Sequence, residues 1–172
     1  MNAPLAFSDP VRINQIGAGL NRTLEPDTDA LRRIARALDL QKLENFVAEM
    51  RLEPAMVGWR LSGRVTAHAV QTCGLSLEPL PVDIDRTFTI PLSDAPPEAD
   101  SEIEVTIDDD APDLIEDGKV DLGQYAVEQL ALSLDPFPRK PGATFVQPEE
   151  PAEISPFGIL KTFKTKGEDG EG

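Results

Sequence analysis

Alternation of apolar and polar residues through the middle of the chain predicts β-strands. In the stretch from Trp59 to Val70, odd positions up to Ala69 are apolar or small and even positions up to His68 are polar. The same period of two recurs over residues 46–52, 82–92 and, more briefly, 103–107. Because such alternation is typical of strands with one buried and one exposed face, we expect an antiparallel sheet. Arg86 lies on the apolar side of its strand, so we expect it at a sheet edge or with its charge extended to water.

The stretch after Pro26 has the periodicity of an amphipathic helix. Asp27 is suited to be its N-cap, because a short acidic side chain accepts hydrogen bonds from free amides of the first turn. The apolar positions recur at helical spacing and are Leu31, Ile34, Ala35 and Leu38. Three arginines fall largely off this stripe and form a small basic face: Arg32, Arg33 and Arg36. A solvated helix face is the favoured interpretation, and contact with RNA phosphates is the alternative.

A second helix is predicted over residues 120–134. Asp121 is a plausible N-cap with Gln124 three residues later, a variant of the capping box, and Pro136 ends the helix. Strands in the middle and two helices predict an α+β fold. We expect an antiparallel sheet or partly closed barrel of about four to six strands with two main helices and a proline-rich C-terminal tail.

The chain of 172 residues has room for one domain of ordinary size. We assign residues 1–138 to a single α+β domain. Prolines cluster near residues 91–97 and again from residue 136, where we expect regular structure to stop, so residues 139–172 are predicted to be a proline-rich tail. Within it, residues 156–166 combine apolar side chains with Lys161, Lys164 and Lys166. This motif is typical of a docking peptide, and a segment that folds back onto its own sheet is an equal alternative.

Charge is the strongest compositional signal. The chain has 16 basic and 31 acidic residues, a net charge of −15, and no lysine or arginine lies between Asp94 and Asp117. This balance counts against a protein that coats nucleic acid with its whole surface. The sequence lacks an apolar run near the roughly 20 residues of a membrane span, and its start lacks the pattern of a secretory signal. With a single cysteine as well, we expect a cytoplasmic protein.

The residue types of common catalytic and metal sites are scarce. His68 and Cys73 have opposite parity along one predicted strand, which disfavours a catalytic pair. These two residues are too few for a structural zinc site, and the acidic run of residues 108–110 lacks the spacing of a calcium loop. Gly17 and Gly19 match no phosphate-binding pattern. We therefore predict no catalytic residue, no metal site and no cofactor.

Four segments, in order, resemble the YceD family of large-subunit ribosomal RNA accumulation proteins. Residues 9–13 resemble the opening strand, residues 63–79 the central strand and cysteine turn, and residues 115–138 the acidic strand, helix start and proline stop. Residues 156–161, Pro-Phe-Gly-Ile-Leu-Lys, resemble the terminal motif.

The turn at Cys73 departs from the pattern of many relatives. Those relatives carry a second cysteine where this chain has Ser76, and a further one downstream, so the resemblance does not carry metal binding over. The sequence of the turn, Thr-Cys-Gly-Leu-Ser-Leu-Glu-Pro, is more similar to that of the alphaproteobacterial branch of the family.

The resemblance implies a ribosome-biogenesis factor, without enzymatic activity, that supports accumulation or processing of precursor large-subunit ribosomal RNA. An anionic protein complements basic polypeptides, so we expect an adaptor for a basic ribosomal or assembly protein, with the RNA contacted indirectly. The acidic residues expected to bind this partner are Asp108, Asp109, Asp110, Glu116, Asp117 and Asp121.

Two other functions remain as alternatives. The first is direct RNA binding through Arg32, Arg33, Arg36 and the lysines of residues 161–166. The second is a nuclease with clustered carboxylates and magnesium. We disfavour the nuclease because the acidic residues lie in a proline-flanked run.

Overall fold

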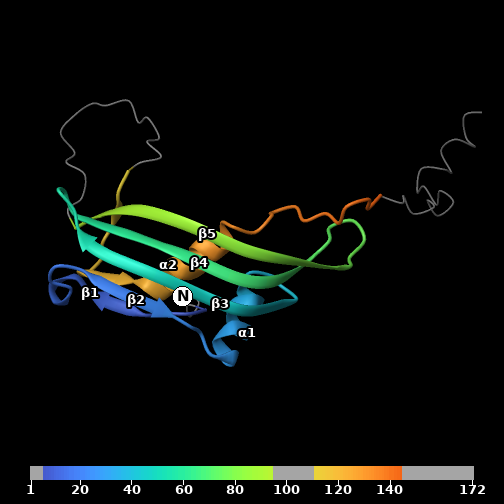
Figure 1. Cartoon of the computed structure of the whole chain (residues 1–172), viewed down its shortest axis with the longest axis horizontal. Helices are drawn as coiled ribbons and strands as arrows, with labels where there is room; N and C mark the ends of the chain where they lie inside the picture. Colours follow the sequence, from blue (N-terminus) through green and yellow to red (C-terminus); the bar gives the residue numbers. More distant parts are fainter. Residues whose placement is uncertain (1–5, 95–110, 145–172) are drawn as a thin grey trace, which may run out of the picture.

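A five-stranded sheet in the order β2–β3–β4–β5–β6 forms the body of the protein (Figure 1). The computed structural model describes residues 6–94 and 111–144. Its long strands are β3 (Lys42–Pro54), β4 (Trp59–Thr72) and β5 (Pro79–Ser93), which pair antiparallel through two hairpins. At its edges, β2 (Leu20–Leu24) is antiparallel to β3 and β6 (Asp113–Leu114) is parallel to β5. The predicted α+β fold is confirmed, and the sheet is not closed into a barrel.

The predicted alternation places the expected residues in the core. Leu61, Val65 and Ala69 of β4 are fully buried, as is Ala48 of β3, whereas the even positions of β4 are at least partly exposed. The helices pack against this one face, because their buried residues join the same core cluster. The predicted strand at residues 103–107 lies outside the described residues.

A β-bulge in β3 changes which residues reach the core. The register with β4 shifts between Glu44 and Val47, and Asn45 has a φ of 52°. Leu43 and Phe46 are both buried although they are three residues apart. Because a bulge adds one residue to the strand, the side chains before and after it can both point to the core although their positions differ in parity. This explains why period-two alternation begins only at Phe46.

Both predicted helix caps are present. Helix α1 (Thr28–Ala37) begins after Asp27, whose side chain accepts a hydrogen bond from the Ala30 amide at 2.7 Å. Helix α2 (Leu122–Ala131) begins after Asp121, which accepts from the Gln124 amide at 3.0 Å. Helix α2 is shorter than the predicted 120–134 at both ends: residues 120 and 121 belong to a strand, and residues 132–134 form a turn and a bend after the helix.

That strand, β7 (Lys119–Asp121), forms a second, two-stranded sheet with β1 (Pro10–Arg12), which leads into the 3-10 helix η1 (Ile13–Gln15). The N-terminal segment also packs closely on α2. A Cβ atom at Gly123 would lie 2.7 Å from the Cα of Ser8. The start of the described chain is therefore held beside the start of α2.

Strand β5 runs through three prolines: Pro79, Pro81 and Pro91. The strand ends at Ser93, within the proline cluster of residues 91–97 that was expected to mark the end of regular structure. Pro91 itself lies inside the strand, which pairs with β4 from Pro79 to Leu92. Prolines are tolerated in a strand where their nitrogen faces away from the ladder. In the described part of the chain, no helix is long and apolar enough to cross a membrane.

Candidate functional site

An acidic groove lies between the β6–β7 turn and α2. Its volume is about 640 Å³. The carboxylates that line it are Asp113, Glu116, Asp117, Asp121 and Glu128. Among its described lining residues, Lys119 is the only cation. The groove therefore has a strongly negative potential, and it brings together three of the acidic residues predicted from the sequence.

Glu116 and Asp117 are the available carboxylates of this groove. Both are exposed, and neither forms a side-chain hydrogen bond or ion pair with another described residue. A tight turn presents them: Asp117 and Gly118 have φ values of 52° and 64°, and the Lys119 amide donates to the Glu116 carbonyl at 3.0 Å. Two unpaired carboxylates on a fixed turn can accept hydrogen bonds from a cationic side chain.

The wall formed by α2 is more constrained. Tyr125 donates its hydroxyl to Asp113 at 3.1 Å, and the Gln124 side chain donates to Glu128 at 2.9 Å. Burial, together with the nearby charge of Asp113, raises the pKa of Tyr125 above its ordinary value. The phenol therefore stays protonated at neutral pH and orients the Asp113 carboxylate.

Asp121 has a structural function in addition to lining the groove. Its Oδ1 accepts from the amides of Gln124 and Asp9, the latter at 2.8 Å, and its Oδ2 accepts from the Ser8 hydroxyl. Most of the hydrogen-bonding capacity of this carboxylate is used inside the protein. Its predicted contact with a partner stays a prediction.

Several predicted residues fall outside the described part of the chain. These are Asp108, Asp109, Asp110, Lys161, Lys164 and Lys166. The division between a domain of residues 1–138 and a tail also stays a prediction, although contacts to the fold continue as far as Lys140.

The arginine face of α1 borders a second hollow, of about 790 Å³, between α1 and the start of β3. Arg32 pairs with Asp29 at 3.3 Å, and Arg33 donates to the Ala6 carbonyl at 3.3 Å. Arg36 has no ion pair to another described residue and lines the hollow with Lys42. All three arginines are exposed, as predicted.

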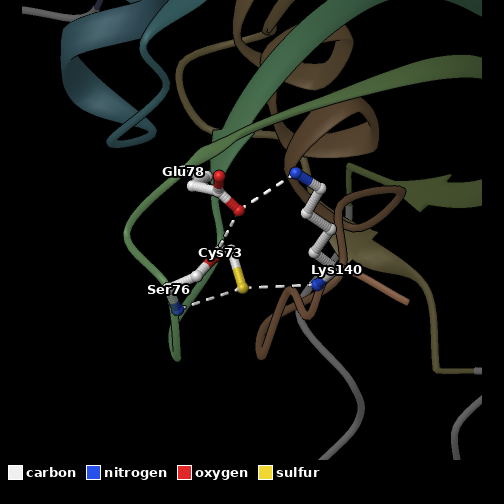
Figure 2. A network of polar contacts seen from close by, with 4 residues as sticks. All are labelled: Cys73, Ser76, Glu78 and Lys140. Atoms are coloured by element: carbon white, nitrogen blue, oxygen red, sulfur yellow. Dashed lines mark hydrogen bonds and ion pairs between the residues drawn. The ribbon is translucent and has the colours of Figure 1, made fainter. Parts of the chain in front are cut away.

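Cys73 lies in a polar network that joins the β4–β5 turn to residues 138–140 (Figure 2). Its Sγ accepts from the amides of Lys140 at 3.3 Å and Ser76 at 3.5 Å, and the Lys140 ammonium pairs with Glu78 at 3.0 Å. These hydrogen bonds, chiefly that from Lys140, lower the pKa of Cys73 to about 6, against the effect of burial. This network was not predicted from the sequence, because backbone donors leave no side-chain signature.

The network does not reproduce a metal centre. Among the described residues, no group of three or more His, Cys, Asp or Glu side chains could hold a metal ion. Ser76 donates to Glu78 at 3.1 Å, so an ion pair and hydrogen bonds close the turn. His68 instead contacts Asp83 at 2.6 Å on the exposed side of the sheet.

Residues 61–164 match the model of a family described as "Large ribosomal RNA subunit accumulation protein YceD". This match covers more than half of the chain, which therefore belongs to the YceD family. No curated protein and no solved structure matches the chain. Its place in the alphaproteobacterial branch stays a prediction.

Proposed function

We propose that this protein supports the accumulation of large-subunit ribosomal RNA in the cytoplasm as an acidic, non-enzymatic adaptor that holds a basic ribosomal or assembly protein. The link to ribosomal RNA rests on the family to which the chain belongs. The adaptor function rests on the acidic groove, above all on the unpaired carboxylates of Glu116 and Asp117.

Charge favours a protein as the direct partner. Ribosomal proteins need their positive charge for RNA, and an anionic surface can occupy that charge before assembly. A chain with a net charge of −15 repels bare RNA at long range, because RNA binding depends on cations that displace counterions from phosphates. The RNA would then be protected through the bound protein.

The test is affinity purification from the native cell, with protein and RNA identified before and after nuclease treatment. The variant Glu116→Gln/Asp117→Asn removes two charges from the groove. The matched control Glu25→Gln/Asp39→Asn removes two charges elsewhere. We expect basic ribosomal proteins to survive nuclease, to decrease with the groove variant and to persist with the control. Recovery of no ribosomal protein would refute the adaptor.

Direct RNA binding is the second candidate function. It is supported by the unpaired Arg36 beside Lys42 in the hollow next to α1. A labelled precursor RNA fragment would then shift in a gel, and its affinity would fall steeply with salt. The charge-reversal variant Arg36→Glu would abolish that shift. A response that is flat with salt would remove this candidate.

A further inference from the structure

Among the described residues, the outer edge of β5 is unpaired along most of its length. In the sheet, β6 pairs only with Leu92 and Ser93. No other described strand pairs with the outer side of β5, which begins at Pro79. An unpaired strand edge presents N–H and C=O groups that can add another strand.

The prolines and two hydrogen bonds establish which residues face outward. The register between β4 and β5 is continuous from Pro79 to Leu92, so backbone groups alternate in direction without a shift. The Glu78 carbonyl, just before β5, accepts from the Cys73 amide, just after β4, whereas the Ser93 carbonyl accepts from the Ile115 amide on the opposite side. The backbone N–H and C=O groups of even residues therefore point toward β4, and those of odd residues point outward. The three prolines, all odd, have their nitrogens on the outer side.

The prolines also limit the length of the usable edge. Pro79, Pro81 and Pro91 offer no outward N–H. Between them, the outward residues Asp83, Asp85, Thr87 and Thr89 each keep an N–H and a C=O. Backbone hydrogen bonds from these four residues to other described residues are absent on that side. The open window therefore runs from residue 83 to residue 89 and fits one short extended segment.

The two faces of this window differ in chemistry. On the exposed face lies a row of Asp83, Asp85, Thr87 and Thr89. Asp85 pairs with Arg64 of β4 through both of its oxygens, whereas Asp83, whose side chain is 90% exposed, contacts His68 through Oδ1. On the core face, Phe88 and Ile90 are only partly buried and pack at the margin of the core. A strand beside β5 would place its own side chains about 5 Å from these. A cation would suit Asp83 through its second oxygen, and apolar side chains would complete the burial of Phe88 and Ile90. Arg86, on the same face as these two residues, donates to the Leu132 carbonyl.

We propose that the β5 edge binds an extended cationic segment of a protein partner by β-strand addition, with basic and apolar residues alternating along it. This inference rests on the proposed function, in that the partner is a basic protein. A second copy of this chain is a poorer occupant, because each chain carries a net charge of −15.

The test uses a fluorescent nine-residue peptide of alternating valine and lysine, measured by anisotropy. Two further peptides carry N-methyl groups either on every lysine amide or on every valine amide. Only one set of amides can face β5, so we expect one methylated peptide to lose binding and the other to keep it. A contact through charge alone would treat the two peptides alike, and equal affinities would overturn the proposal.

A matched pair of variants tests the protein side. Thr87→Pro removes an outward N–H without touching the ladder to β4, and Thr87→Val keeps it. We expect Thr87→Pro to weaken peptide binding by about tenfold or more, from the lost hydrogen bond and the clash of the ring. We expect Thr87→Val to bind within about twofold of the unchanged chain, since valine is also a good strand residue. If Thr87→Pro fails to fold, the two methylated peptides decide the question alone.

Two outcomes separate this inference from the proposed function. Capture of a basic ribosomal protein that is lost with Glu116→Gln/Asp117→Asn but unchanged with Thr87→Pro would refute the edge and leave the adaptor intact. Failure of every cationic polypeptide to bind would refute both.

A stable dimer whose residue 83–89 amides resist hydrogen exchange without peptide would also overturn the proposal, because a second copy would then fill the edge.

Discussion

Asp121 offers the sharpest test of how the start of α2 is built. Its carboxylate caps the helix through the Gln124 amide and also holds the Ser8 hydroxyl and the Asp9 amide. Asp27 caps α1 and accepts one hydrogen bond, from Ala30. The two caps are therefore a matched pair, and their difference measures the attachment of the N-terminal segment.

The expected magnitudes follow from these contacts. Loss of an N-cap costs about 1 kcal/mol, which is our expectation for Asp27→Ala. Asp121→Ala also leaves the Asp9 amide without its acceptor, at a further cost of about 1 kcal/mol. The sum of about 2 kcal/mol lowers the Tm by about 4–8 °C for a chain of this size. Asp121→Asn should cost less, because asparagine is also a good N-cap.

The assay is urea unfolding followed by circular dichroism, with the m-value checked for each variant. Limited proteolysis should cut near Ser8 faster in Asp121→Ala than in Asp27→Ala. Equal losses of unfolding free energy in the two alanine variants would refute the reasoning. The N-terminal segment would then be held by packing alone.

Three other predictions follow from the described contacts. Thiolate absorbance of the folded chain should rise with a midpoint near pH 6. The hydrogen bonds to the Cys73 thiolate should therefore increase the free energy of unfolding as the pH rises from about 6 to about 9, and this stabilisation should be lost as the pH falls through 6. Cys73→Ser should remove this pH dependence, and absence of an absorbance step below pH 8 would contradict the prediction. Gly123→Ala should destabilise the chain by about 1–3 kcal/mol in urea unfolding, because the new methyl group meets the Ser8 backbone; unchanged stability would mean that the N-terminal segment moves aside freely. Lys140→Met should release the C-terminal segment from Glu78 and speed its proteolysis after Arg139, with little change in global unfolding because the ion pair is exposed; an unchanged rate would show that the backbone contacts suffice.

The sequence predicted the elements whose signal is local. The alternation in β4 and β5 and the caps of both helices depend on neighbouring residues, and all were predicted. Strand β2 was missed, because its middle residues Asn21, Arg22 and Thr23 are all exposed and break the period of two. Strands β1 and β7 are three residues each, too short to show a period.

The candidate site was predictable in part. Glu116 and Asp117 stand out in sequence because they lie at the end of a stretch from Asp94 to Asp117 that contains no lysine or arginine, and both line the acidic groove. Asp113 and Tyr125 were missed, since only the fold brings them together across 12 positions. The open edge did leave a signal: prolines at positions 79, 81 and 91 have the same parity within a strand pattern.

The parallel pairing of β5 with β6 has a consequence for how related chains can differ. Leu92 pairs with Asp113, so the sheet itself holds these two points together whatever the number of residues between them. For flexible loops in general, closing the loop costs only about 0.6 kcal/mol more for each doubling of its length. Related chains can therefore carry connections of different length between these two paired points at little cost to the stability of the sheet.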